Sequence, residues 1–167
     1  LDCFSGDPLQ YHSFINVFDD SVDKVTGDGS TKLTRLLQYT TGRAKEAIKS
    51  CAMVGGEKGY QLARRTLKER FGNDLLISEK LISTLKNGNH IKSATDLQLL
   101  SDQMINCNEI LSRMKRLDEI NSQHFIASIV DRLQMFQKNK WRKEAMDMKR
   151  NKDRYPDFED LTKFIQQ

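Results

Sequence analysis

The strongest constraint on this chain is the helical spacing of its apolar residues. The 167-residue sequence contains only two prolines, so long helices can form without interruption. No sustained stretch alternates apolar and polar residues as a half-buried strand would. The clearest apolar stripe steps by three and four residues and consists of Leu97, Leu100, Met104, Cys107, Leu111 and Met114. The pattern predicts an all-α fold.

Turn residues divide the apolar pattern into about nine helices. Four helices precede Gly72, which is typical of the residue that follows a helix end, and five follow Asn73. Asp74 can cap the first of these five. We therefore predict two small helical lobes, at residues 1–73 and 74–167. The stripe from Leu97 to Met114 covers fewer than three heptads, so we interpret it as a core helix rather than a coiled coil.

Charge and cysteine content narrow the function classes. The net charge is +4, and each half carries +2, which indicates weak non-specific attraction to nucleic acid at most. Three widely spaced cysteines form no disulfide framework, so we expect reduced thiols. No run of about 18 apolar residues is present, so no membrane partner is expected. Because the chain begins with Leu1, we expect a segment of a longer protein.

Catalytic and metal-binding patterns are missing from the sequence. His12, His90 and His124 stand alone, without cysteine, histidine or carboxylate neighbours at metal-ligand spacing. Cys107 lies on the apolar stripe, where we expect an inert buried thiol rather than a nucleophile. The glycine pairs lack the phosphate-loop pattern and lie between helices. We predict a non-enzymatic protein with no catalytic residue, cofactor or metal.

A basic stretch near the C-terminus is the one candidate nucleic-acid contact. Between residues 138 and 154, eight basic and three acidic residues give a net charge of +5. Trp141 and Tyr155 are interleaved, which single-stranded RNA could use for stacking. We select Lys138, Lys140 and Lys143 as candidate RNA contacts. The alternative is a solvated helix face with Trp141, Ala145 and Met148 turned towards the core.

The first seventy residues carry a specific combination of motifs. Its members are Phe4, Gly6, Asp7, Pro8, Phe14, Phe18, Lys32, Leu33, Leu36, Tyr39, Gly42, Ala44, Tyr60, Ala63, Leu67, Arg70, Phe71 and Gly72. Together they resemble the capsid region of Bel/Pao-type retrotransposon Gag proteins, which opens with F-x-G-D-P followed by two phenylalanines and whose first lobe ends in L-x-x-R-F-G. Gly6 permits a tight turn, Asp7 caps the helix, and Phe4 can pack onto that helix as a staple.

This resemblance implies a two-lobed capsid protein whose main partner is itself. The N-terminal lobe would form rings, and the C-terminal lobe would form a two-fold dimer contact through the helix near residues 121–133. We select Gln123, Ile126 and Val130 as the exposed face of that contact. The implied location is cytoplasmic, in virus-like particles that enclose RNA.

Departures from the family pattern keep a second interpretation open. From Asp74 onward only helix order and lengths match. No CCHC zinc knuckle, aspartic protease motif or major homology region is present, so RNA binding through flanking regions is expected. The chain could instead be a domesticated Gag-derived adaptor whose N-terminal lobe binds partner peptides.

Overall fold

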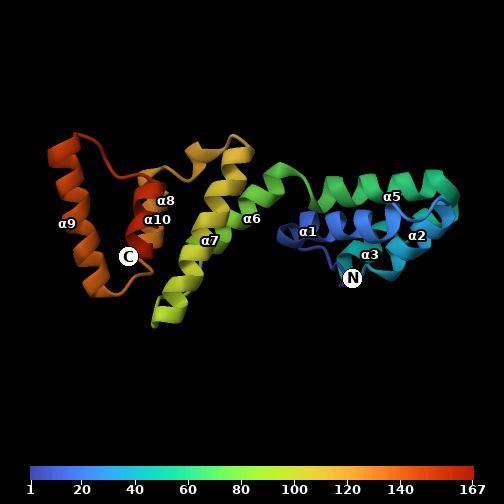
Figure 1. The fold of residues 1–167 in the computed structure, drawn as a ribbon, viewed down its shortest axis with the longest axis horizontal. Coiled ribbons are helices and arrows are strands. Elements are labelled where there is room, and N and C mark those ends of the chain that lie inside the picture. Colours follow the sequence, from blue (N-terminus) through green and yellow to red (C-terminus); the bar gives the residue numbers. More distant parts are fainter. The chain divides into compact units, whose positions relative to one another are not determined.

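The computed structural model describes residues 1–167 and contains ten α-helices (Figure 1). They are α1 (Pro8–Phe18), α2 (Gly29–Gln38), α3 (Gly42–Ile48), α4 (Cys51–Val54), α5 (Gly56–Phe71), α6 (Asp74–Lys86), α7 (Ala94–Arg113), α8 (Gln123–Val130), α9 (Met135–Lys152) and α10 (Phe158–Gln166). A π-helical turn, η1 (Asp19–Asp23), and a 3-10 turn, η2 (Leu117–Glu119), complete the elements. The all-α prediction is confirmed, and the helix count is close to the predicted nine.

Two compact units divide the chain, residues 1–80 and 81–167, and each has its own apolar core. The predicted boundary at Asn73 coincides with the start of α6, where the Asn73 side chain accepts the backbone N–H of Leu76 at 2.9 Å. The division between the units instead falls within α6. It does so because Leu81, Ile82 and Leu85, at the end of α6, belong to the second core.

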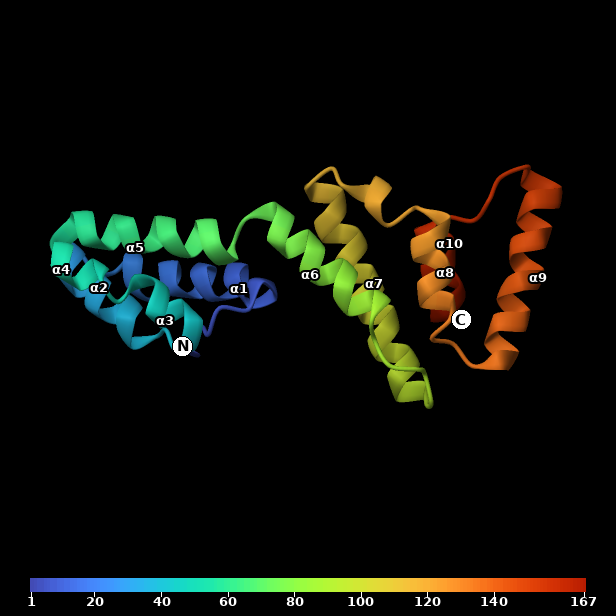
Figure 2. The ribbon, with the colours of Figure 1, turned by 180° about the vertical axis from the view of Figure 1, so that it is seen from behind.

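Helix α5 organises the first unit, because α1, α2, α3 and α4 all contact it. Figures 1 and 2 both show α1 running alongside α5. The Asp7 carboxylate accepts the Leu9 backbone N–H at 3.0 Å, and Pro8 occupies the first turn of α1, as predicted. The core residues are Phe4, Tyr11, Phe14, Ile15, Phe18, Val22, Leu33, Leu36, Ala44, Ile48, Cys51, Tyr60, Ala63, Leu67 and Phe71.

Phe4 closes the first unit. Its ring stacks on Phe14 with centroids 5.2 Å apart and meets Phe71 edge-on at 5.7 Å. Its backbone N–H donates to the Tyr39 carbonyl at 2.8 Å, and its carbonyl accepts the Thr41 N–H at 2.9 Å. The predicted staple onto α1 is therefore confirmed, and it extends to the last residue of α5. The N-terminal segment holds α1, the end of α2 and the end of α5 together.

The chain after α1 departs from the predicted helix. We expected the first apolar face to continue through Val22 and Val25. The backbone instead winds into η1, where Lys24 N–H reaches the Asp19 carbonyl at 2.9 Å, five residues back. Val22 remains buried, but the extra residue in this turn leaves Val25 exposed.

Helix α7 organises the second unit and packs against α10. Leu100, Met104, Cys107 and Leu111 are almost completely buried, so the predicted stripe is a core helix. The core residues of this unit are Leu85, Ile91, Leu100, Met104, Cys107, Leu111, Ile120, Phe125, Ile126, Ile129, Leu133, Trp141, Phe158, Leu161 and Ile165.

Charged caps define the start of α10. The Asp157 side chain accepts the Asp160 backbone N–H at 2.9 Å, and the Asp160 carboxylate accepts the Asp157 N–H at 2.9 Å. Arg154 forms two further bonds to the same carboxylate, at 2.5 and 3.1 Å. Because the Arg154 guanidinium favours the charged form, the pKa of Asp160 falls to about 2.

The close approach at Gly72 gives a stability prediction. A Cβ on Gly72 would lie only 2.2 Å from the Tyr11 ring, at a backbone φ of −114° that any residue can adopt. Gly72→Ala should therefore lower the unfolding free energy by about 1–3 kcal/mol through overpacking alone. Gly27→Ala is the matched control, because nothing lies within 4 Å of that Cβ. Urea unfolding followed by circular dichroism checks this, and equal effects of the two substitutions would contradict it.

The Asp160 cap should stabilise the fold less as the pH falls. Its pKa is lowered in the folded state, so its contribution is present above its ordinary pKa of 3.8 and disappears as the pH falls towards 2. Asp160→Asn should cost about 1 kcal/mol at pH 7 and almost nothing near pH 2. Paired thermal melts across this range measure the difference. A cost that does not change with pH would show that the charge is unimportant.

Candidate assembly surfaces

A half-buried polar cluster ties η1 to α5. Both terminal nitrogens of Arg64 bond to the Asp19 carboxylate. The Tyr60 hydroxyl donates to Asp23 at 2.6 Å, and the Lys32 ammonium lies 3.4 Å from the same carboxylate. Burial and the Asp23 bond raise the pKa of Tyr60, and the Tyr60 hydroxyl lowers the pKa of Asp23. All charges in this cluster are paired, so its role is to fix η1 in place.

Two large exposed apolar side chains of the first unit lie on α4, at the N-terminal end of α5 (Figure 2). Met53 is 91% exposed and Val54 is 55% exposed. Beside Val54 lies a hollow of about 390 Å³ whose lining includes half-buried Leu62 and the cations Lys58 and Arg65. We call these five residues the α4–α5 patch. Exposed apolar side chains beside polar residues are typical of protein contacts.

Sequence reasoning missed the α4–α5 patch, although a signal was present. The predicted inward face of this region was Ala44, Ala47, Ile48 and Cys51. Met53 and Val54 are apolar but fall outside that spacing and immediately precede a glycine pair. Large apolar residues that leave the core face are candidates for contacts with another molecule.

The three predicted two-fold residues do not share an exposed face. Ile126 is only 3% exposed and belongs to the second core, so its predicted exposure is wrong. Helical spacing explains this, because Ile126 lies beside Ile129 on the inward side of α8. Gln123 is exposed and donates to the Pro156 carbonyl at 3.1 Å, and Val130 is half-buried. The residue that completes their face is exposed Ala127, and we call Gln123, Ala127 and Val130 the α8 face.

The three lysines predicted to contact RNA point in different directions. With 3.6 residues per turn, Lys138 and Lys140 lie about 200° apart around α9. Trp141 is buried and packs against Phe164 at 5.3 Å, so it is not free to stack on bases. The interpretation with Trp141 in the core is therefore confirmed. Of the three lysines, Lys143 lies nearest to the side of α9 opposite Trp141.

That opposite side combines cations with apolar side chains. Met135, Phe136 and Met146 are all strongly exposed there. We call this side the outer face of α9, and it consists of Met135, Phe136, Lys143, Met146 and Arg150. Its two cations form no ion pair within the chain.

The three histidines and Cys107, for which the sequence predicts no catalytic role, do not form a cluster. His12, His90 and His124 are exposed on separate elements. Cys107 is buried, as expected, and burial raises its pKa to about 12, which keeps the thiol protonated at neutral pH. No group of three or more histidine, cysteine or acidic side chains is arranged to hold a metal ion. The prediction that the protein is not an enzyme stays a prediction.

These features define an all-α protein of two compact units, each with apolar side chains on its surface. A family model described as "Protein of unknown function (DUF1759)" matches residues 4–150. The chain therefore belongs to the DUF1759 family, which is typically found in retrotransposon Gag-like proteins. No curated protein and no solved structure matches it. None of its helices combines the length and apolar character needed to cross a membrane.

Proposed function

We propose that this chain is the structural capsid subunit of a Bel/Pao-type retroelement Gag protein. It self-associates into oligomers and virus-like shells that enclose the element's RNA in the cytoplasm. The observation that carries the proposal is membership in a family found in Gag-like proteins. The closure by Phe4 adds support, because the residues resembling the Bel/Pao opening and the end of its first lobe meet in one contact.

Ring formation by the first unit uses the α4–α5 patch. Burying Met53 and Val54 against a second copy removes apolar surface from water, at roughly 25 cal/mol per Å². Lys58 and Arg65 flank that surface and orient the partner through charge. A heterologous contact of this kind closes into a ring when its rotation allows. The patch is small, so each contact is weak and many act together in a shell.

Pairing of the second unit uses the α8 face. A two-fold contact brings the same helix of two copies together, so the surface must be self-complementary. Ala127 at its centre is small and allows close approach of two helices. Gln123 and Val130 lie on either side of it, one polar and one apolar. Two members of the original prediction, Gln123 and Val130, are thus retained, and Ala127 replaces Ile126.

Sedimentation velocity tests both contacts. The chain should form larger species as concentration and salt increase. Ala127→Arg should weaken dimerisation about tenfold or more, since a long charged side chain would meet its own copy across the two-fold axis. Met53→Ser should reduce species larger than the dimer.

Met146→Ser is the matched control, because it removes an exposed methionine from a face that forms no contact between copies in this proposal. A chain that remains monomeric at high concentration and high salt would contradict the proposal. Equal effects of Met53→Ser and Met146→Ser would contradict the location of the ring contact.

Enclosed RNA would meet the outer face of α9. Replacing both Lys143 and Arg150 by Glu should weaken single-stranded RNA binding at least about tenfold and reduce its salt dependence. Two Glu substitutions at Lys138 and Lys140 change the net charge equally but lie further round the helix, so they should weaken binding less. Fluorescence anisotropy with a labelled oligonucleotide measures this. Equal losses of RNA affinity in the two variants would show non-specific attraction. Absence of RNA binding by the unmodified chain would contradict the contact through α9.

The adaptor interpretation has one specific observation in its favour. A groove of about 340 Å³ lies in the first unit between the N-terminal segment and α1. Phe4 and Phe14 line it beside exposed Val17. An extended peptide could occupy such a groove. Saturable one-to-one peptide binding without any larger assembly would favour this function over the capsid.

A further inference from the structure

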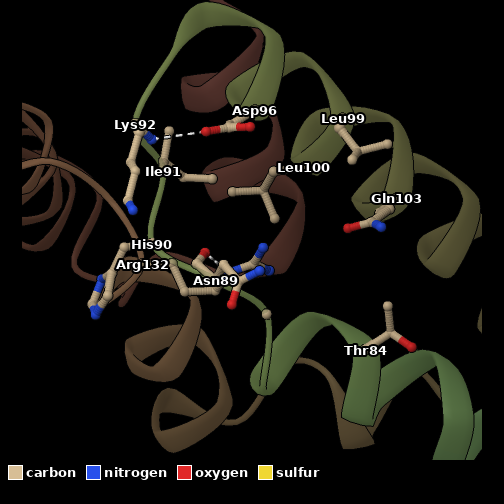
Figure 3. Close-up of a pocket in the computed structure, with 11 residues that line it drawn as sticks. Thr84, Asn89, His90, Ile91, Lys92, Asp96, Leu99, Leu100, Gln103 and Arg132 are labelled. Atoms are coloured by element: carbon tan, nitrogen blue, oxygen red, sulfur yellow. Dashed lines mark hydrogen bonds between the residues drawn. The ribbon is translucent and has the colours of Figure 1, made fainter.

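A second groove, of about 510 Å³, lies entirely within the second unit, beside the start of α7 and the segment that follows α6 (Figure 3). Figure 3 shows Arg132 and Asn89 at one end. Asp96 lies at the other end, where its carboxylate accepts the Lys92 backbone N–H at 3.0 Å. Leu100 lies between the two ends. The volume is within the range of binding sites for small ligands.

Arg132 brings a positive charge without a counter-ion to this groove. Its Nε donates to the Asn89 carbonyl at 3.0 Å, and its Nη1 donates to the Leu85 carbonyl at 2.8 Å. Both acceptors are neutral, and Nη2 forms no hydrogen bond. A Cβ on Gly88 would lie 2.2 Å from the guanidinium carbon, so the absence of a side chain there makes room for Arg132. The guanidinium is thus held in place with one nitrogen unused.

The opposite end of the groove does not neutralise this charge. Asp96 is the only acidic residue in the lining, and it is engaged at the start of α7, where its own N–H donates to Ser93 at 3.1 Å. Lys92 adds a second cation to the lining. A half-buried guanidinium with a free donor and no carboxylate partner favours an anionic ligand.

The size and apolar surface of the groove select the class of anion. A single phosphate is only a few times the ~30 Å³ volume of a water molecule and would leave most of the groove empty. Ile91 and Leu100 lie in the lining but are buried in the core, so the accessible apolar surface of the groove comes from Leu99, which is 58% exposed. The complementary ligand therefore carries both a carboxylate and an aliphatic group.

We propose that this groove binds an extended peptide in which an acidic residue stands next to an aliphatic one. The carboxylate accepts from Nη2 of Arg132, and the aliphatic side chain packs against Leu99. The site is separate from the surfaces assigned to assembly, so this inference does not depend on the capsid proposal.

The test is a titration of the isotope-labelled chain 1–167, followed by the backbone amide resonances of Asn89, Lys92 and Gln103 in NMR spectra. The probes are the blocked tripeptide acetyl-Leu-Asp-Leu-amide, its Asn analogue and inorganic phosphate. The acidic tripeptide should shift these resonances and bind at least about tenfold more tightly than the Asn analogue. Added salt should weaken its binding.

Variants locate the peptide. Arg132→Gln should abolish the preference for Asp over Asn, but it also removes two bonds to backbone carbonyls. Leu99→Ser leaves those bonds intact and should weaken binding of the acidic tripeptide about fivefold to tenfold. Leu75→Ser is the control, because Leu75 is a similarly exposed leucine in the other unit.

Four outcomes would overturn the proposal. The first two are unchanged groove resonances with about 10 mM acidic tripeptide and equal affinity for the Asp and Asn tripeptides. The other two are equal effects of Leu99→Ser and Leu75→Ser, and phosphate that binds as tightly as the tripeptide. A negative result in this titration would not bear on the self-assembly proposal, because self-assembly is measured by sedimentation without any peptide.

Discussion

The aromatic contact of Phe4 with Phe14 and Phe71 is the interaction on which the first unit depends. It joins the N-terminal segment to the last residue of α5, and these two segments lie near opposite ends of the unit's sequence. Short helices are marginal by themselves and are stable only when their apolar faces are buried. The contact supplies that burial where α1 and α5 meet, and the Tyr39 and Thr41 backbone bonds fix the segment in position. The same helix α5 then carries one side of the α4–α5 patch.

The second unit meets the same requirement with a different geometry. A single long helix, α7, buries one continuous stripe, and α8 and α10 add Phe125 and Phe158, whose rings stack at 6.1 Å. Helix α9 contributes little beyond Trp141 to this core. The outer face of α9 is therefore available to other molecules, and so is the α8 face. Stable cores with uncovered apolar side chains suit a protein that functions through association.

Much of the fold followed from local rules, whereas the surfaces did not. Periodicity placed the core stripe of α7, and the Asp7-Pro8 cap placed the start of α1, because both depend on neighbours three or four residues away. The prediction that Ile126 is exposed was wrong, because exposure depends on which side of α8 faces the core. That side is set by residues distant in sequence. The winding of η1 and the guanidinium of Arg132 beside Gly88 likewise depend on residues distant in sequence.

Electron microscopy of the concentrated chain in the presence of RNA tests the central claim most directly. A capsid subunit with one ring contact and one two-fold contact should form closed or tubular particles with a regular lattice. Particles of uniform curvature built from rings are the predicted result. Fields that contain only dispersed monomers, or amorphous aggregates that lack a lattice, would contradict the assignment of this chain as a capsid protein.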